Sequence, residues 1–283
     1  MNNFAIIGVG RWGQILLKSF SKKVKFKKFA SSGNCKNTIA ARNIEPSIVE
    51  SSLNNILNDT EIQNIIIATP LESLYRIARD SVIAGKNIFL EKPGALNASQ
   101  VNELKILCTE NQALYINYLY ACDPIFEKIK ALVSSEEILE IKCFWKKSSL
   151  SNQDILLNLA CHDIFLVTNL LKCNDVSILK KKIEKSQCHV ELSIDNKLIK
   201  IFIDSSSNQR EKRFYIKTKK NVLLWDIYNK KLFINGKETF CSAEDLVDKT
   251  RDKFLDMIVN QTKEGYSKSR TVMTLDIIEK IRK

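Results

Sequence analysis

Residues 4–13 read FAIIGVGRWG, a short apolar run followed at once by three closely spaced glycines. Its glycine motif is Gly8-Val9-Gly10-Arg11-Trp12-Gly13. The apolar run predicts a buried strand, and the residues that follow predict a helix. In such a turn the first glycine permits a sharp bend, the second lets a pyrophosphate approach the backbone amides, and the third allows helix and strand to pack closely. The stretch therefore predicts a dinucleotide-binding turn.

Strand-like and helical stretches alternate through the first 120 residues. The predicted strands are 4–7, 24–30, 65–69, 87–90 and 114–118, and the predicted helices are 11–20, 38–43, 71–84 and 99–110. Alternation at this spacing indicates a parallel sheet with right-handed crossovers. We therefore expect an NAD(P)-binding Rossmann domain, a doubly wound α/β fold, over residues 1–120.

The pattern changes after residue 120. Helices are predicted at 125–133, 155–171, 243–262 and 271–282, with a strand at 138–145. Between residues 175 and 235 several strand-like runs are joined by short polar turns, which is typical of an antiparallel sheet. Residues 121–283 are thus expected to form an α+β domain, with an open and largely antiparallel sheet, for substrate binding and oligomerisation.

Composition narrows the class of protein. The chain has 283 residues, a net charge of +12, eight cysteines and two histidines. None of the cysteines forms a C-x-x-C pair, which argues against a disulfide framework or a metal cluster and for a cytoplasmic protein without metal. No nucleic-acid-binding signature accompanies the scattered basic residues. No apolar run is long enough to span a bilayer, and no signal peptide is expected.

The residues after the second predicted strand bear on the choice of cofactor. Dinucleotide sites that prefer NAD usually place an acidic residue there to hold the ribose 2′-hydroxyl. No Asp or Glu precedes Glu45, and the strand instead ends at Ser31 and Ser32. A carboxylate would repel a 2′-phosphate, whereas serines accept one. NADP is therefore the expected cofactor, with NAD as the alternative.

Four further segments share a family pattern. They are IIIATP (65–70), AGK (84–86), NIFLEKP (87–93) and LNLACHDI (157–164). Together with the glycine motif they resemble the glucose-fructose oxidoreductase/inositol dehydrogenase/MocA (Gfo/Idh/MocA) family. The resemblance implies that Ala68, Thr69, Pro70 and Glu91 join the glycine motif in binding the cofactor, and that Lys92 and His162 face the nicotinamide and the substrate.

The chemistry of Lys92 and His162 agrees with that implication. A lysine after a parallel strand can stabilise a developing alkoxide, and a histidine titrates near neutrality, so it can move a hydroxyl proton. The family usually carries an aspartate one helical turn before the histidine, where this chain has Asn158. Asn158 can orient substrate or imidazole, but it cannot stabilise an imidazolium as a carboxylate would.

The resemblance implies hydride transfer between a nicotinamide cofactor and a hydroxyl or carbonyl carbon of a sugar or nucleotide-sugar, in surface-polysaccharide synthesis. Two alternatives stay open: a reductase of a non-sugar carbonyl or imine, and a non-enzymatic dinucleotide-sensing regulator on the same fold. The exposed face of the second sheet predicts a homo-oligomer. Neither nucleic acid nor a membrane is expected as a partner.

Overall fold

A computed structural model describes residues 3–148, 153–260 and 265–283, and the chain divides into two compact units. The first unit contains Met1–Leu119 together with Asp245–Val272. The second contains Tyr120–Glu244 together with Met273–Lys283.

The first unit is built on a six-stranded parallel sheet in the order β3-β2-β1-β4-β5-β6. Its strands are β1 (Phe4–Ile7), β2 (Phe26–Ala30), β3 (Val49–Glu50), β4 (Asn64–Ile67), β5 (Asn87–Glu91) and β6 (Leu114–Asn117). Its helices are α1 (Arg11–Phe20), α2 (Cys35–Ile44), α3 (Leu53–Leu57), α4 (Leu71–Ile83), α5 (Ala98–Leu107) and α8 (Leu246–Asn260). Every residue of β1, β4 and β6 is buried, as expected for strands with both faces covered.

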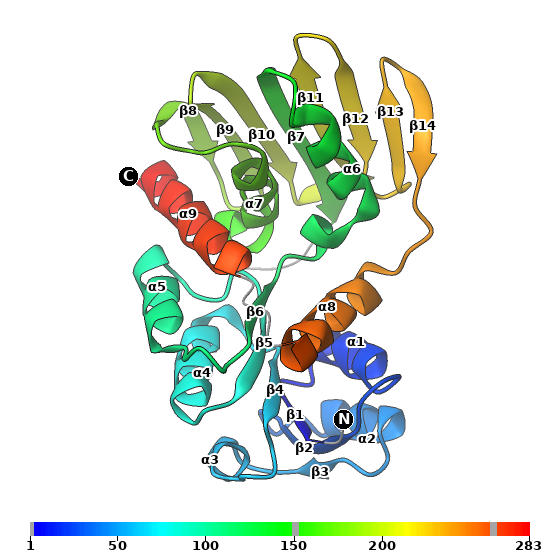
Figure 1. The fold of residues 1–283 in the computed structure, drawn as a ribbon, viewed down its shortest axis with the longest axis vertical. Coiled ribbons are helices and arrows are strands. Elements are labelled where there is room, and N and C mark those ends of the chain that lie inside the picture. Colours follow the sequence, from blue (N-terminus) through cyan, green and yellow to red (C-terminus); the bar gives the residue numbers. More distant parts are fainter. Residues whose placement is uncertain (1–2, 149–152, 261–264) are drawn as a thin grey trace. The chain divides into compact units, whose positions relative to one another are not determined.

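Helices cover both faces of this sheet (Figure 1). On one face α1 and α8 meet through an aromatic cluster in which Phe254 of α8 lies 6.4 Å from Phe20 and 5.6 Å from Phe89, measured between ring centroids. On the other face α4 packs on α5, β4 and β5. The helix α4 ends where Gly85 takes a φ of +75°, the left-handed conformation that favours glycine.

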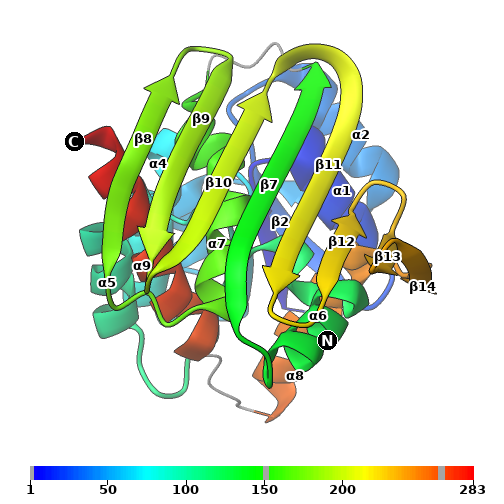
Figure 2. The same cartoon turned by 90° about the horizontal axis from the view of Figure 1, so that it is seen from above.

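The second unit is built on an eight-stranded sheet in the order β14-β13-β12-β11-β7-β10-β9-β8 (Figure 2). Its strands are β7 (Ile138–Ser148), β8 (Val176–Ile183), β9 (Gln187–Ile194), β10 (Lys197–Asp204), β11 (Ser206–Thr218), β12 (Val222–Asp226), β13 (Lys231–Ile234) and β14 (Lys237–Cys241). All neighbouring strands pair antiparallel except β7 and β10, which run parallel.

Helices cover one face of this sheet, and the other face is open in Figure 2. The helical segments are η1 (Leu119–Cys122), α6 (Pro124–Val133), the π-helical turn η2 (Leu156–Ala160), α7 (Cys161–Leu170) and α9 (Gly265–Arg282), which contributes to both units. Buried, inward-facing strand residues alternate with half-buried ones, so the core of this unit lies between the sheet and α6 and α7.

The structure confirms the predicted fold class: a Rossmann sheet followed by a largely antiparallel one. Several details differ from the sequence-based expectation, which contained neither β3 nor α3. The helix predicted at 155–171 is a π-helical turn continued by α7. The segment Asp245–Val272, expected in the second domain, packs with the first unit through Phe254. The helix predicted at 243–262 corresponds to α8, which ends at Asn260. Residues 261 and 262 of the prediction lie outside the described ranges.

Candidate functional site

Two of the three motif glycines are required by the fold of the turn itself. Gly8 has a φ of +90°, and its N–H donates to the carbonyl oxygen of Ala30 at 2.9 Å. A Cβ on Gly8 would lie 2.5 Å from the carbonyl oxygen of Ala68, and a Cβ on Gly13 would lie 2.0 Å from that of Gly8. A side chain at either position therefore collides with backbone, as the sequence motif predicts.

Gly10 differs from these two because no atom lies within 4 Å of the position its Cβ would take. It is the N-cap of α1, which begins without a side-chain cap and without an acidic residue in its first turn. By contrast, α2, α5 and α6 are each capped by a side-chain oxygen. The free space at Gly10 and the uncapped amides of Arg11 and Trp12 fit a pyrophosphate at this helix N-terminus.

The segment Ala68-Thr69-Pro70 lies beside the turn. The Ala68 N–H donates to Ile7 at 2.8 Å, which extends the pairing of β1 and β4, and Pro70 is the N-cap of α4. The hydroxyl of Thr69 is buried and forms no hydrogen bond with any described residue. A buried hydroxyl left in this state indicates a partner that the chain itself does not provide.

Glu91, the last residue of β5, connects this edge of the sheet to α1. Its buried carboxylate accepts a hydrogen bond from Asn117 Nδ2 at 2.7 Å and another from the Trp12 side chain. Burial raises the pKa of the Glu91 carboxyl, although both hydrogen bonds oppose that shift. Lys92 follows directly and is half-buried at the carboxyl end of a parallel strand, where open α/β sheets bind their ligands.

Asn117 is a residue of this site that was not predicted from the sequence. It pairs with Glu91 in the register of β5 and β6, and it ends the strand LYIN as its only amide side chain. A polar residue at the carboxyl end of an apolar parallel strand, next to the EKP strand, was the available signal. The side-chain oxygen Oδ1 of Asn117 is buried without a hydrogen-bond partner among the described residues.

Ser31 and Ser32 follow β2 at the same edge of the first sheet, half-buried and exposed respectively. The next residue, Gly33, has a φ of +85°, and α2 then begins with Asn34 as its cap. No acidic residue occurs in the first 44 positions. The feature that selects against a 2′-phosphate is thus absent from this part of the sequence.

An aspartate at position 31 is expected to move the cofactor preference toward NADH. Charge repulsion between the new carboxylate and the 2′-phosphate should weaken NADPH binding roughly tenfold or more, and leave NADH binding nearly unchanged. Calorimetric titration of Ser31→Asp with both cofactors measures this, with the neutral Ser31→Asn as matched control. A strong preference of the unmodified protein for NADH would contradict the expectation.

Asn158 and His162 are the two exceptions in a buried helical segment of the second unit. Between Ile155 and Thr168 they are the only residues that are not buried. The first lies in the π-helical turn η2 and the second in α7. Being four positions apart, they share a face, and π-turns are frequent at functional sites.

Two aromatic rings pack against His162. Its imidazole lies 5.3 Å from the ring of Tyr120 and 5.6 Å from that of Trp145, measured between centroids, and both contacts are edge-on. Burial raises the pKa of the Tyr120 hydroxyl, so this phenol stays protonated. The surroundings of His162 are thus aromatic on two sides.

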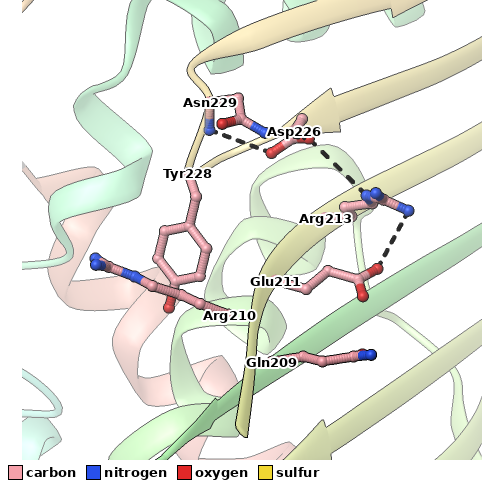
Figure 3. Close-up of a pocket in the computed structure, with 7 residues that line it drawn as sticks. All are labelled: Gln209, Arg210, Glu211, Arg213, Asp226, Tyr228 and Asn229. Atoms are coloured by element: carbon pink, nitrogen blue, oxygen red, sulfur yellow. Dashed lines mark hydrogen bonds and ion pairs between the residues drawn. The ribbon is translucent and has the colours of Figure 1, made fainter.

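A polar pocket of about 490 Å³ is lined in part by Tyr228, which contacts Trp145 (Figure 3). The Trp145 indole N–H donates to the hydroxyl of Tyr228 at 2.8 Å, and the guanidinium of Arg210 lies 4.6 Å from the centre of the Tyr228 ring. The pocket is lined by Gln209, Arg210, Glu211, Arg213, Asp226, Tyr228 and Asn229. It was not predicted, because its residues come from β11, from the end of β12 and from the turn after β12, and the sequence did not define how these strands pair.

Other kinds of site find little support in the described residues. No group of three His, Cys, Asp or Glu side chains in them is arranged to hold a metal ion. All eight cysteines are free thiols. Of the helices described, none is both long and apolar enough to cross a membrane.

The fold and the glycine turn define a dinucleotide-binding protein with a second, open-sheet domain. Residues 2–119 match the model of an oxidoreductase family with an NAD-binding Rossmann fold, Gfo/Idh/MocA. The predicted family and the predicted nicotinamide cofactor are confirmed.

One curated relative is the "uncharacterized oxidoreductase YrbE" of Bacillus subtilis (strain 168). It is 28% identical over 138 residues, which is 47% of this chain and 40% of the relative. The matched part of the chain thus spans less than half the length of this relative.

The whole chain is similar in fold to two solved structures. UDP-N-acetylglucosamine 3-dehydrogenase GnnA from Acidithiobacillus ferrooxidans has a TM-score of 0.86 at 16% identity, covering 99% of this chain and 97% of that one. KijD10, a 3-ketoreductase from Actinomadura kijaniata in complex with TDP-benzene and NADP, has a TM-score of 0.88 at 11% identity. The match covers 100% of this chain and 96% of that one. At these identities the likeness concerns the fold.

Proposed function

We propose that the chain is an NAD(P)-dependent oxidoreductase acting on a hydroxyl or carbonyl carbon of a nucleotide-linked sugar. One observation carries the proposal: Asn158 and His162 are the two half-buried polar side chains in a helical segment that is otherwise buried. Evenly apolar packing would serve the fold equally well, so an amide and an imidazole on one face indicate a ligand. The family of the N-terminal region supplies the reaction class.

In this proposal each residue has one task. A nicotinamide cofactor held by the glycine turn would supply the hydride chemistry. His162 takes the proton from the substrate hydroxyl in the oxidative direction and returns it to the carbonyl oxygen in the reductive one. Lys92 stabilises the charge that develops on that oxygen, and Asn158 orients the substrate by hydrogen bonding. The glycine turn would hold the pyrophosphate. Ser31 and Ser32 would accept the 2′-phosphate on the ribose, so that NADP is preferred to NAD.

Direct assay tests this function. Mass spectrometry of nucleotide released from the purified protein identifies the cofactor. Nicotinamide absorbance then reports turnover with UDP- and TDP-linked sugars, free sugars, and non-sugar carbonyl and imine compounds. Turnover confined to the last group would favour the alternative reductase, and tight NADP(H) binding without turnover on any of them would favour a sensor.

Arg210 supports a phosphate-bearing substrate. Among the described residues it forms no ion pair, whereas its neighbour Arg213 lies 3.2 Å from Glu211 and 3.9 Å from Asp226. Figure 3 shows Arg210 and Tyr228 on one side of the strand, and Arg213 and Glu211 on the other. A guanidinium without a carboxylate partner, packed on Tyr228, whose hydroxyl is hydrogen-bonded to Trp145, suits the diphosphate of a nucleotide-sugar.

Replacing Arg210 by glutamine is expected to weaken UDP binding by about 10–100-fold, because a hydrogen bond to a charged group contributes roughly 1.5–3 kcal/mol. The matched control is Arg213→Gln, whose side chain is already paired and should matter little. Calorimetric titration of both variants with UDP measures the difference. Equal losses in the two variants, or no loss in either, would argue against a diphosphate site at Arg210.

We also propose that copies of the chain associate through the open face of the second sheet. On that face Phe144 stacks on Phe202 at 5.3 Å, and His189 stacks on Phe202 at 4.2 Å. A row of half-buried aromatic rings is characteristic of a protein–protein contact. Light scattering during size-exclusion chromatography gives the number of subunits.

A further inference from the structure

The second unit contains a buried lysine in its sheet. Lys212 belongs to β11, at a position whose inward-facing successors are Phe214 and Ile216, and its side chain is 0% exposed. Its ammonium lies 2.8 Å from Oδ1 of Asp163, a carboxylate that is 3% exposed. Removing two charges from water is costly, and a well-packed apolar pair of similar volume is often as stable or more so. Stability of the fold therefore does not explain this pair.

The contacts of the ammonium indicate what the pair does. Nζ of Lys212 lies 3.2 Å from the centre of the Trp145 ring and 4.8 Å from that of Tyr120. A desolvated cation over an aromatic ring is attracted by the negative charge of the ring face. These are the same two rings that pack edge-on against His162. One buried cation thus holds both rings that touch the imidazole.

Trp145 and Asp163 each have a further connection that fixes their position. The indole N–H of Trp145 is bonded to the Tyr228 hydroxyl at 2.8 Å. Asp163 is the next residue after His162 in α7, so the ion pair ties the backbone beside the histidine to β11. Burial raises the pKa of the Asp163 carboxyl and lowers that of the Lys212 ammonium, and their mutual attraction opposes both shifts.

We propose that Lys212, held by Asp163, is a positioning residue for His162: it fixes Trp145 and Tyr120, and these rings fix the imidazole. This inference rests on the proposed function, in which His162 moves the substrate proton. It assigns Lys212 no contact with the substrate. Its effect is on the orientation of the histidine, to which proton transfer is sensitive, since a displacement of 1 Å can cost on the order of 100-fold in rate.

The test uses the fact that the chain has two histidines. Their ring protons are readily separated by NMR, and His189, stacked on Phe202 in β9 and β10, serves as the internal reference. In Lys212→Met the signals of His162 should move, because the ring currents of Trp145 and Tyr120 change. Those of His189 should stay. Turnover is expected to fall by about 10–100-fold, with cofactor affinity unchanged.

Two further variants separate positioning from folding. Lys212→Met combined with Asp163→Asn removes both charges and leaves no unpaired buried ion, so it is expected to fold if the single variant does not. Lys212→Arg keeps a cation for both rings and should restore part of the turnover. If the folded double variant leaves the His162 signals or the turnover unchanged, the inference is wrong. If the signals move as expected but His162→Ala has normal turnover, the proposed catalytic role fails while the positioning stands.

Discussion

Replacing His162 by alanine is expected to lower turnover by about 10²–10⁴-fold, the range that a general acid–base group typically contributes. Cofactor affinity should stay near that of the unmodified protein, because the glycine turn and the segment 68–70 belong to the first unit and His162 to the second. Steady-state kinetics on an active nucleotide-sugar, together with calorimetric titration of NADPH, measure the two quantities separately.

The matched control for this variant is His189→Ala. His189 is the other histidine of the chain, half-buried on the open face of the sheet, and its loss should leave turnover nearly unchanged. Because alanine also removes a ring that packs on Tyr120 and Trp145, His162→Asn is a useful companion that keeps a polar side chain there. Turnover within a few-fold of normal in both His162 variants would exclude the histidine from the reaction and favour the sensor.

Local signals predicted five of the six strands of the first sheet, and only the two-residue edge strand β3 was missed. The strand 4–7 and the helix 11–20 coincide with β1 and α1. Gly13 is required by its contact with the Gly8 carbonyl oxygen, five residues earlier, and a contact between near neighbours in sequence is visible in a motif. The continuous apolar run at Ile65–Ile67 likewise indicated a strand buried on both faces.

Long-range pairing was the part that the sequence did not reveal. Alternation predicted the strands of the second sheet, but not that β7 pairs parallel with β10, since neither strand carries the register of its partner. Similarly, the pattern of α8 shows that it has an apolar face, yet it does not say which sheet that face covers. Phe254 meets Phe20 and Phe89, far away in the sequence, and this contact assigns the helix to the first unit.

The ion pair of Lys212 and Asp163 shows where a signal was present but unused. In β11 the side chains at 212, 214 and 216 point to the same face, and the last two are apolar core residues. A lysine that begins such a row conflicts with the alternating pattern, and conflicts of this kind concentrate at functional sites. Its partner is 49 residues away in α7, so no local motif connects the two.

Replacing Gly10 by valine is expected to abolish most of the cofactor affinity while leaving the fold intact. No atom lies within 4 Å of the added Cβ, and the φ of −66° at this N-cap is open to any residue. The helix should lose only about 1 kcal/mol, the usual cost of a poor N-cap. The valine fills the space from which a pyrophosphate reaches the amides of α1, and each hydrogen bond to a charged group is worth roughly 1.5–3 kcal/mol.

Losing two such bonds weakens binding by about 10²–10⁴-fold, since 1.4 kcal/mol corresponds to a factor of ten. Calorimetric titration of Gly10→Val with NADPH and NADH should show this loss, and thermal unfolding should show a Tm close to normal. Gly13→Val is the contrasting variant. Its Cβ would lie 2.0 Å from the Gly8 carbonyl oxygen, so the protein itself should be strongly destabilised. Normal affinity in a folded Gly10→Val protein would mean that the dinucleotide does not bind at this turn, because a valine there leaves the pyrophosphate no route to the helix N-terminus.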